Sequence, residues 1–339
     1  MHSQSRILAH PASAASEHAE RLALLYKAAG DLLRLQILRL LRSDSLGVLE
    51  MSSILDIRQS ALSHHLKVLF NAGLVSTRRE GNAIFYRRAF LPPDDALSTQ
   101  KRSIFAGADQ VELDAQVLAR LTVVKQQREQ HSREFFKRVA DKFKENQELV
   151  AELQQYLDSL RDLLHGLALP REATILEVGP GEGNLLALLS QVGSKVIALD
   201  NSAEMLDKAA ATVKAEDLQN VELVLGDPGV ALARGIKADL VIFSMVLHHL
   251  ASPAEAFVDS ANLLRPDGCL LIVDLCRHHQ EWVRQNCGDL WQGFEPEELA
   301  GWALQAGFRE GQSLYLSLRN GFQVQMRLFH LPPAERPIP

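Results

Sequence analysis

The feature that most restricts the fold is a glycine-rich segment, EVGPGEG at residues 177–183, which lies between two apolar runs. The first run, ATIL, is typical of a strand, and the second, NLLALL, is typical of a helix. Gly179, Gly181 and Gly183 let the backbone turn sharply and approach a ligand closely. A strand, a glycine-rich turn and a helix in this order predict a nucleotide-type pocket in an α/β domain.

Strand-like and helix-like segments alternate after residue 174. Strands are predicted at residues 174–178, 195–200, 221–227, 238–246 and 268–275. Strands separated by helices favour a doubly wound, mostly parallel sheet. Two later runs, at residues 313–318 and 323–329, are close in sequence and predict an antiparallel hairpin at the edge of that sheet.

Carboxylates stand where the predicted strands end. Glu177 can hold the amino-acid end of a ligand, Asp200 can accept both hydroxyls of a ribose, and Asp227 can bond an adenine amino group. A dinucleotide fingerprint would require a third glycine at position 184, which is Asn184. The pattern therefore favours an adenosyl ligand over both a dinucleotide and an empty structural domain. The predicted cofactor-binding residues are Glu177, Gly179, Gly181, Gly183, Asp200, Asn201, Met205, Gly226, Asp227 and Ser244.

The segments LEVGPGEG, LDNSAEML, MVLHHL and LLRPDGCLLIVD resemble class I S-adenosylmethionine-dependent methyltransferases, across about residues 131–330. The resemblance implies a Rossmann-like domain that binds S-adenosylmethionine or S-adenosylhomocysteine. It makes Phe135 and Phe136 candidates for a lid over the ligand, although core packing explains them at least as well. It identifies neither a methyl acceptor nor a catalytic residue.

The first 95 residues have a different pattern. Helical periodicity begins at Glu17, and four helical segments precede a predicted hairpin at residues 74–89. Asp31 is expected to cap the second helix and Ser60 the fourth, which runs to Phe70 and would turn its leucines toward the core. Two helices joined by a short turn, followed by a hairpin, predict a winged helix-turn-helix.

Charge supports DNA as the partner of this front region. The chain carries a net charge of −6, yet residues 1–95 hold 12 basic and 9 acidic side chains. A local basic surface on an acidic protein suits phosphate contacts. A solvated packing module is the alternative reading. The predicted DNA-binding residues are Gln59, Ser60, Ser63, His64 and Lys67 on the recognition helix, with Arg78, Arg79 and Asn82 on the hairpin.

Two stretches, AAGDLLRLQILRLL and SALSHHLKVLFNAGLVSTRREGNAIFYRRA, resemble the ArsR/SmtB family of winged-helix repressors, over about residues 20–90. The resemblance implies a homodimer on an inverted-repeat operator. Metal-sensing members carry a cysteine pair in the helix before the recognition helix, whereas VLEMSSILD here has none. Sensing of soft metals through thiolates is therefore disfavoured.

No metal is predicted elsewhere in the chain. Cys276, His278, His279 and Cys287 match no common zinc-ligand spacing. The pair His248–His249 can serve as a base, but a structural or pocket-rim role is favoured. Trp282, Trp291 and Phe294 can line a cavity, although core packing is their default role.

The sequence thus predicts a disordered N-terminus (1–16), a winged helix-turn-helix (17–95), a helical connector with lid helices (96–166) and a class I methyltransferase-like domain (167–332). The expected function is a DNA-binding regulator that senses the adenosyl ligand without turnover and controls methionine-cycle genes. An active methyltransferase with an attached regulatory domain is the alternative. Three late cysteines and no membrane-length apolar stretch predict a reduced, cytoplasmic protein with no membrane partner.

Overall fold

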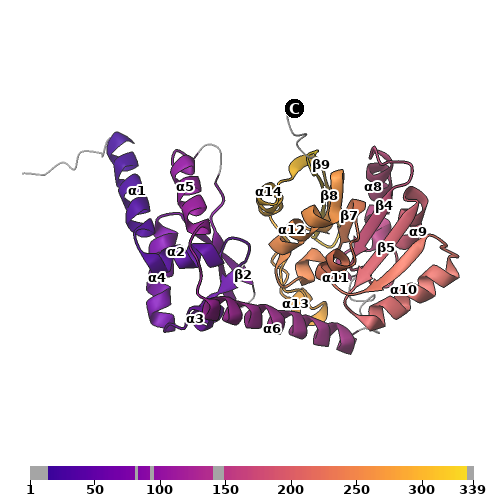
Figure 1. The fold of residues 1–339 in the computed structure, drawn as a ribbon, viewed down its shortest axis with the longest axis horizontal. Helices are drawn as coiled ribbons and strands as arrows, with labels where there is room; N and C mark the ends of the chain where they lie inside the picture. Colours follow the sequence, from indigo (N-terminus) through magenta and orange to yellow (C-terminus); the bar gives the residue numbers. More distant parts are fainter. Residues whose placement is uncertain (1–13, 81–82, 92–94, 140–148, 334–339) are drawn as a thin grey trace, which may run out of the picture. The chain divides into compact units, whose positions relative to one another are not determined.

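The computed structural model describes residues 14–80, 83–91, 95–139 and 149–333. The chain divides into two compact units, Met1–Leu121 and Thr122–Pro339, here termed the front and rear units. The helices expected as a separate connector are shared between these units. The helix α6 (Ala115–Val139) begins in the front unit and ends in the rear one (Figure 1).

The front unit combines helices with a small antiparallel sheet. Its sheet has the order β1-β3-β2, so the predicted hairpin gains a third, two-residue strand that sequence reasoning did not foresee. The elements of this unit are α1 (Ala14–Ala29), α2 (Leu32–Leu40), β1 (Leu46–Gly47), α3 (Val48–Leu55), α4 (Gln59–Asn71), β2 (Val75–Glu80), β3 (Ala83–Arg88) and α5 (Ser98–Asp109).

Local chemistry explains the ends of the front helices. The Asp31 side chain accepts a hydrogen bond from the Arg34 amide and caps α2, as predicted. The expected cap of α4 at Ser60 is wrong, because that helix begins at Gln59 after Arg58. Gly73, with φ 65°, ends the helix turn that leads into β2.

The rear unit contains a seven-stranded sheet of order β6-β5-β4-β7-β8-β10-β9. Strands β4 to β8 are all parallel. Strand β10 pairs antiparallel with both β8 and β9, so the predicted edge hairpin is confirmed. The strands are β4 (Thr174–Val178), β5 (Lys195–Asp200), β6 (Val221–Leu225), β7 (Ala238–Ser244), β8 (Leu264–Leu275), β9 (Arg309–Ser317) and β10 (Gln323–His330).

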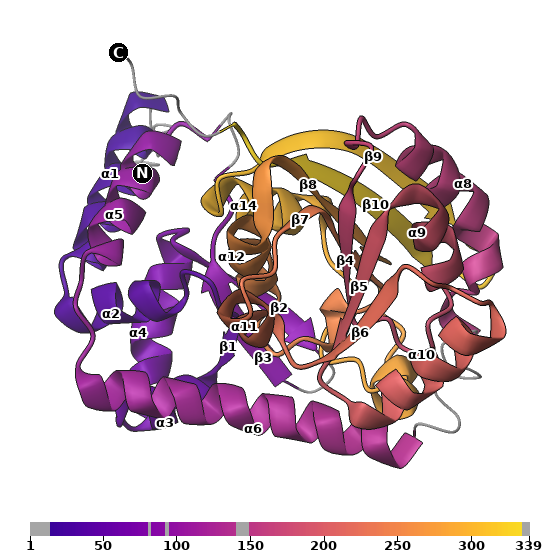
Figure 2. The same ribbon diagram turned by 45° about the vertical axis from the view of Figure 1, so that its right-hand side comes forward.

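Helices cover both faces of this sheet, as a doubly wound fold requires. Figure 2 shows α8, α9 and α10 on one face, and α11, α12 and α14 on the other. The helical elements of the unit are α8 (Leu153–His165), α9 (Leu186–Val192), α10 (Ala203–Ala215), α11 (Pro228–Ala233), the short 3₁₀ helix η1 (Leu247–His249), α12 (Pro253–Leu263), α13 (Trp282–Asn286) and α14 (Pro296–Gln305). The predicted fold class is therefore confirmed.

Within the part of the chain that the structure describes, none of the helices combines the length and the apolar character that a membrane crossing needs.

Candidate functional site

A cavity of about 690 Å³ lies in the rear unit. Since β4, β5, β6 and β7 are parallel, their carboxyl ends meet at one edge of the sheet, and the residues that follow them line this cavity. Of the predicted cofactor-binding residues, the structure places Glu177, Gly179, Gly181, Asp200, Asn201, Met205, Gly226, Asp227 and Ser244 in its wall.

The glycine-rich turn has the backbone geometry that sequence reasoning expected. Gly179 has φ 71°, and a Cβ atom there would lie 2.7 Å from a methyl group of Val246. Gly183 is the exception among the predicted residues, because it does not line the cavity. A Cβ atom at Gly183 would lie 3.3 Å from the Ala209 Cα atom, so this glycine lets the loop pack against α10.

Two carboxylates define the electrostatics of the cavity. Glu177 is buried, and its Oε2 atom has no hydrogen-bond partner among the described residues. Burial and the charge of Asp200 raise the pKa of Glu177 to about 8. Burial also raises the pKa of Asp200 to about 6, although backbone amides, including that of Ser202, oppose the shift. A cationic or hydrogen-bond-donating ligand would stabilise the ionised form of both carboxyl groups.

Asp227, which is predicted to contact an adenine, also caps a helix. One of its carboxylate oxygens, Oδ1, accepts a hydrogen bond from the Val230 amide at 3.0 Å and caps α11. The backbone conformation at Gly226, with φ 152°, brings Asp227 to the cavity edge, and the Gly226 amide donates to Asp200 O at 2.8 Å.

Sequence reasoning missed several residues of the cavity wall, because they belong to helices distant from the glycine motif. Tyr156 on α8 lines the cavity beside Ser244, and burial raises the pKa of its hydroxyl to about 12 despite a hydrogen bond with Ser244. Burial, with the charges of Glu255 and Asp227, raises the pKa of Asp259 to about 6.

The wall of the cavity is strongly acidic. No lysine or arginine lines it in the described ranges. Lys208 and Lys125 pair with two of its carboxylates, Glu182 and Glu255, from outside the wall. A ligand with a positive charge therefore suits this site. The acidic residues of the wall are Glu129, Glu152, Glu177, Glu182, Asp200, Asp227, Glu255 and Asp259.

The aromatic candidates take structural positions. Phe135 does not line the cavity but is buried against Gly288, where an added Cβ atom would lie 2.3 Å from its ring. Helix α6 instead contributes Glu129 and Ser132 to the wall. The side chain of Phe136 lies outside the described residues. The three other candidates, Trp282, Trp291 and Phe294, do not line the cavity either.

The histidine pair after β7 lies beside the cavity. His249 lines the wall, whereas His248 is buried behind it and hydrogen-bonds through Nδ1 to Asp274 Oδ1 at 2.8 Å. Burial lowers the pKa of His248, but the charges of Asp274 and Asp289 outweigh that effect and raise it to about 9. Burial and the neighbouring His248 lower the pKa of His249 well below its ordinary value.

The recognition helix α4 presents two distinct faces. Leu62, Leu66 and Leu69 are fully buried, as expected. The predicted DNA-binding residues of the helix are all exposed, namely Gln59, Ser60, Ser63, His64 and Lys67. The Ser63 hydroxyl donates to Gln59 O at 2.8 Å, so a hydrogen bond donated to a DNA phosphate would compete with this bond, whereas the hydroxyl oxygen can still accept one from a base.

The predicted residues of the wing differ from one another. Arg79 is exposed on β2. Arg78 is instead hydrogen-bonded through Nε to Glu80 on the same side of the strand, so its guanidinium is engaged in an ion pair within the wing. The structure therefore does not present Arg78 as an open phosphate contact. The position of Asn82 lies outside the described residues.

Two families match separate parts of the chain. Residues 31–77 match the family described as bacterial regulatory protein, arsR family, and residues 149–310 match the family described as methyltransferase domain.

Short parts of the chain match individual bacterial proteins. The chain is 42% identical over 79 residues to the biofilm growth-associated repressor of Agrobacterium fabrum, covering 23% of this chain and 68% of that protein. It is 44% identical over 70 residues to the transcriptional activator HlyU of Vibrio cholerae, covering 21% of this chain but only 65% of that protein. A solved O-methyltransferase family protein from Burkholderia thailandensis is 18% identical, with a TM-score of 0.45, and the match covers 95% of this chain and 97% of that one.

Proposed function

Because the chain belongs to the arsR family of bacterial regulatory proteins and also carries a methyltransferase domain, we propose that it regulates transcription in response to an adenosyl ligand. The front unit binds an inverted-repeat operator as a repressor, and the rear unit binds S-adenosylmethionine or S-adenosylhomocysteine as a signal. The regulated genes are those of the methionine and S-adenosylmethionine cycle.

The observation that carries this proposal is the buried Glu177 carboxylate. Its Oε2 atom has no hydrogen-bond partner among the described residues, although an ionised carboxylate so deeply buried is costly without one. Both candidate ligands carry an α-ammonium group, which can donate to this oxygen as a charge-assisted hydrogen bond. Asp200, at the end of the adjacent strand, lines the same cavity, and its carboxylate can accept hydrogen bonds from the ribose hydroxyls.

Helix α6 gives the ligand a route to the DNA-binding part of the chain. In the rear unit, Lys125 pairs with Glu255 and Arg128 donates to Ala251 O, and both of these partners line the cavity. In the front unit, Arg120 of the same helix donates through Nε to Ile54 O at 2.6 Å, in the last turn of α3, which precedes the recognition helix. Ligand binding that shifts Glu255 or Ala251 therefore acts on α6 directly.

A homodimer is part of the proposal, because an inverted-repeat operator requires two recognition helices related by twofold symmetry. The exposed apolar side chains of α1 support it, since Leu24 and Tyr26 are 54% and 56% exposed. The molar mass of the full chain in solution, measured by light scattering with and without operator DNA, tests this element on its own.

A second function, methyl transfer to a small acceptor, is supported by two observations. Residues 149–310 match a methyltransferase family, and the cavity of about 690 Å³ lies in the upper part of the range for small-molecule pockets, which leaves room for an acceptor beside the adenosyl ligand. Positioning supplies most of what such a reaction needs from a protein, so an obvious base is not required.

The deciding experiment is fluorescence anisotropy of a labelled duplex from the region upstream of the protein's own gene, titrated with the full chain. The titration is repeated with S-adenosylmethionine, with S-adenosylhomocysteine and with neither. A sensor changes its DNA affinity about tenfold, or about 1.4 kcal/mol, with one of the ligands. The variant Asp200→Asn should bind the duplex normally but lose the response.

The opposite outcome is equally clear. If calorimetry shows that both ligands bind while the DNA affinity stays the same in all three titrations, the sensor proposal fails. Methyl transfer then becomes the favoured function, and radiolabelled S-adenosylmethionine with candidate acceptors is the next measurement.

A further inference from the structure

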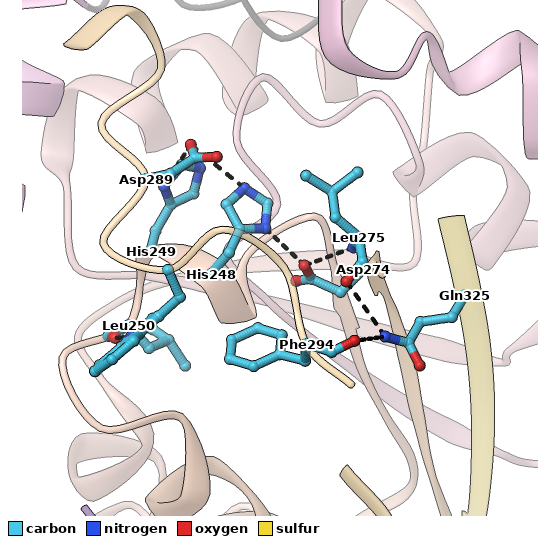
Figure 3. A network of polar contacts seen from close by, with 9 residues as sticks. His248, His249, Leu250, Asp274, Leu275, Asp289, Phe294 and Gln325 are labelled. Atoms are coloured by element: carbon cyan, nitrogen blue, oxygen red, sulfur yellow. Dashed lines mark hydrogen bonds and ion pairs between the residues drawn. The ribbon is translucent and has the colours of Figure 1, made fainter. Parts of the chain in front are cut away.

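A buried cluster of His248, His249 and Asp289 adjoins the cavity. The two histidines form the end of η1, directly after β7, and Asp289 comes from the loop after α13 (Figure 3). One ligand atom from each of the three residues lies within 4.8 Å of the others. All three side chains are almost fully enclosed.

Two separations inside the cluster are close to those of ligands around a shared ion. Asp289 Oδ1 lies 3.8 Å from His248 Nε2 and 3.7 Å from His249 Nδ1. These separations exceed a hydrogen bond. Two ligand atoms bound to one zinc ion at about 2.1 Å each, with an angle of about 110–125° between the bonds, lie about 3.4–3.7 Å apart.

A second carboxylate orients one of these histidines. Asp274 Oδ1 on β8 lies 2.8 Å from His248 Nδ1, so Nε2 points toward Asp289, as Figure 3 shows. A carboxylate that holds the far nitrogen of a histidine is the usual outer partner of a metal-binding imidazole, because it fixes the ring and raises its basicity.

The third residue is also held in place. The amides of Leu290 and Trp291 both donate to His248 O, at 3.0 and 3.1 Å, and Trp291 Nε1 donates to Leu250 O at 2.8 Å. These bonds fasten the loop that carries Asp289 onto η1. The cluster is therefore assembled from two segments about 40 residues apart in sequence and is fixed before any ion arrives.

We propose that His248, His249 and Asp289 form a binding site for one divalent transition-metal ion in the wall of the cavity. Two imidazoles and one carboxylate are the ligand set of open zinc and iron(II) sites, which keep a position for water or another ligand. Because His249 lines the cavity, a small molecule in the cavity can reach the ion from that side. The site is independent of the proposed sensing function.

The competing structure is a purely protonic network, in which a doubly protonated His248 faces Asp274 through Nδ1–H and Asp289 through Nε2–H. Both structures place the same residues together, but only one takes up an ion with defined stoichiometry. A titration with a metal probe therefore separates them.

The test uses the full chain without a polyhistidine tag, stripped with a chelator and titrated with Co²⁺ and with Zn²⁺ in competition with a chromogenic chelator. We expect one ion per chain and a visible Co²⁺ absorption without the intense thiolate-to-cobalt band. Asp289→Asn should weaken affinity at least tenfold. Asp274→Asn should weaken it by about 10–100-fold, as outer-shell changes do.

His279→Gln is the matched control, because His279 is an exposed histidine of the same unit outside the cluster, and it should bind the ion like the wild type. Far-ultraviolet circular dichroism checks that each variant is folded, and Asp274→Asn alone decides if Asp289→Asn is not. The proposal is overturned if the wild type takes up no stoichiometric ion, if a thiolate band appears, or if the folded cluster variants bind as tightly as His279→Gln.

Discussion

Glu177, one residue before the end of β4, and Asp200, the last residue of the adjacent parallel strand β5, line one cavity, and the charge of Asp200 adds to the burial that raises the pKa of Glu177. Two carboxyl groups placed in this way make the ligand-free protein sensitive to pH. They also make the cavity selective for a ligand that brings positive charge.

The first prediction concerns stability without ligand. The pKa of Glu177 is about 8 in the folded chain, against 4.5 for an ordinary glutamate, so the folded state holds an extra proton between these values. The contribution of Glu177 to the free energy of unfolding is therefore fully present below about pH 4.5, and this contribution is lost as the pH rises toward 8. Asp200, whose pKa is raised from 3.8 to about 6, acts in the same direction at lower pH.

The thermal stability of Glu177→Gln should fall less steeply between pH 5 and 8 than that of the wild type. The exposed control Glu216→Gln should match the wild type.

The second prediction concerns ligand affinity. If the ionised Glu177 holds the α-ammonium group, S-adenosylhomocysteine should bind more tightly as the pH rises from 6 to 8. Glu177→Gln keeps the shape but loses the charge, which removes about 1.5–3 kcal/mol, or about 10–150-fold in Kd. Isothermal titration calorimetry at several pH values measures both effects. A Glu177→Gln protein with wild-type affinity and wild-type pH dependence would exclude this role.

The third prediction separates steric clash from backbone strain. Gly179 and Gly235 have nearly the same φ, 71° and 70°, but a Cβ atom at Gly179 would lie 2.7 Å from Val246, whereas nothing lies within 4 Å at Gly235. Gly179→Ala should therefore lower the free energy of unfolding by about 1–3 kcal/mol more than Gly235→Ala. Chemical denaturation of the rear-unit transition compares them. Equal decreases in the free energy of unfolding would mean that the Val246 side chain moves away from the added Cβ atom without destabilising the fold.

The fourth prediction concerns DNA. Lys67 is exposed on α4, and if it binds a phosphate, Lys67→Ala should weaken binding to all sequences alike. The slope of log K against log salt should become shallower by about 0.9 for each phosphate that the variant no longer neutralises. Anisotropy titrations at several salt concentrations provide this slope. Lys214→Ala, an exposed lysine of the rear unit, is the control and should leave the slope unchanged.

The fifth prediction concerns coupling through α6. Arg120 contacts Ile54 O in the front unit and does not line the cavity. Arg120→Gln should bind the adenosyl ligand with normal affinity but show a smaller change in DNA affinity on ligand binding, with a decrease of about 0.5–2 kcal/mol in coupling. Calorimetry measures the ligand affinity, and anisotropy on the same preparation measures the change in DNA affinity. An unaltered response would exclude this interaction as part of the route.

The sequence was most informative where backbone geometry limits the choice of residue. Gly179 and Gly226 stand at positive φ beside valine side chains, and only glycine fits such positions easily, so the motif predicted the loop. Carboxylates at strand ends were equally predictable, since parallel topology brings the ends together. Gly183 shows the limit of this reasoning, because the same motif places it against α10 and away from the cavity.

The residues that sequence reasoning missed depend on long-range packing. Tyr156, Glu255 and Asp259 come from helices whose pattern indicates only an amphipathic surface, and no local signal shows that they face the cavity. The pairing of Arg78 with Glu80 was missed for another reason. A basic residue in a wing is usually interpreted as a DNA contact, but Glu80 lies two positions along the same strand and can pair with it. The cluster of His248 and Asp289 likewise joins distant segments.

Helix α6 is 25 residues long, and the division between the two units falls inside it. The junction of the two units is therefore a helical segment and not a loop. Inserting one residue at the division would turn all later positions of the helix by about 100° against the earlier ones, whereas seven residues would nearly restore the original phase. A change in the length of this helix therefore changes its phase, which a change in the length of a loop would not do.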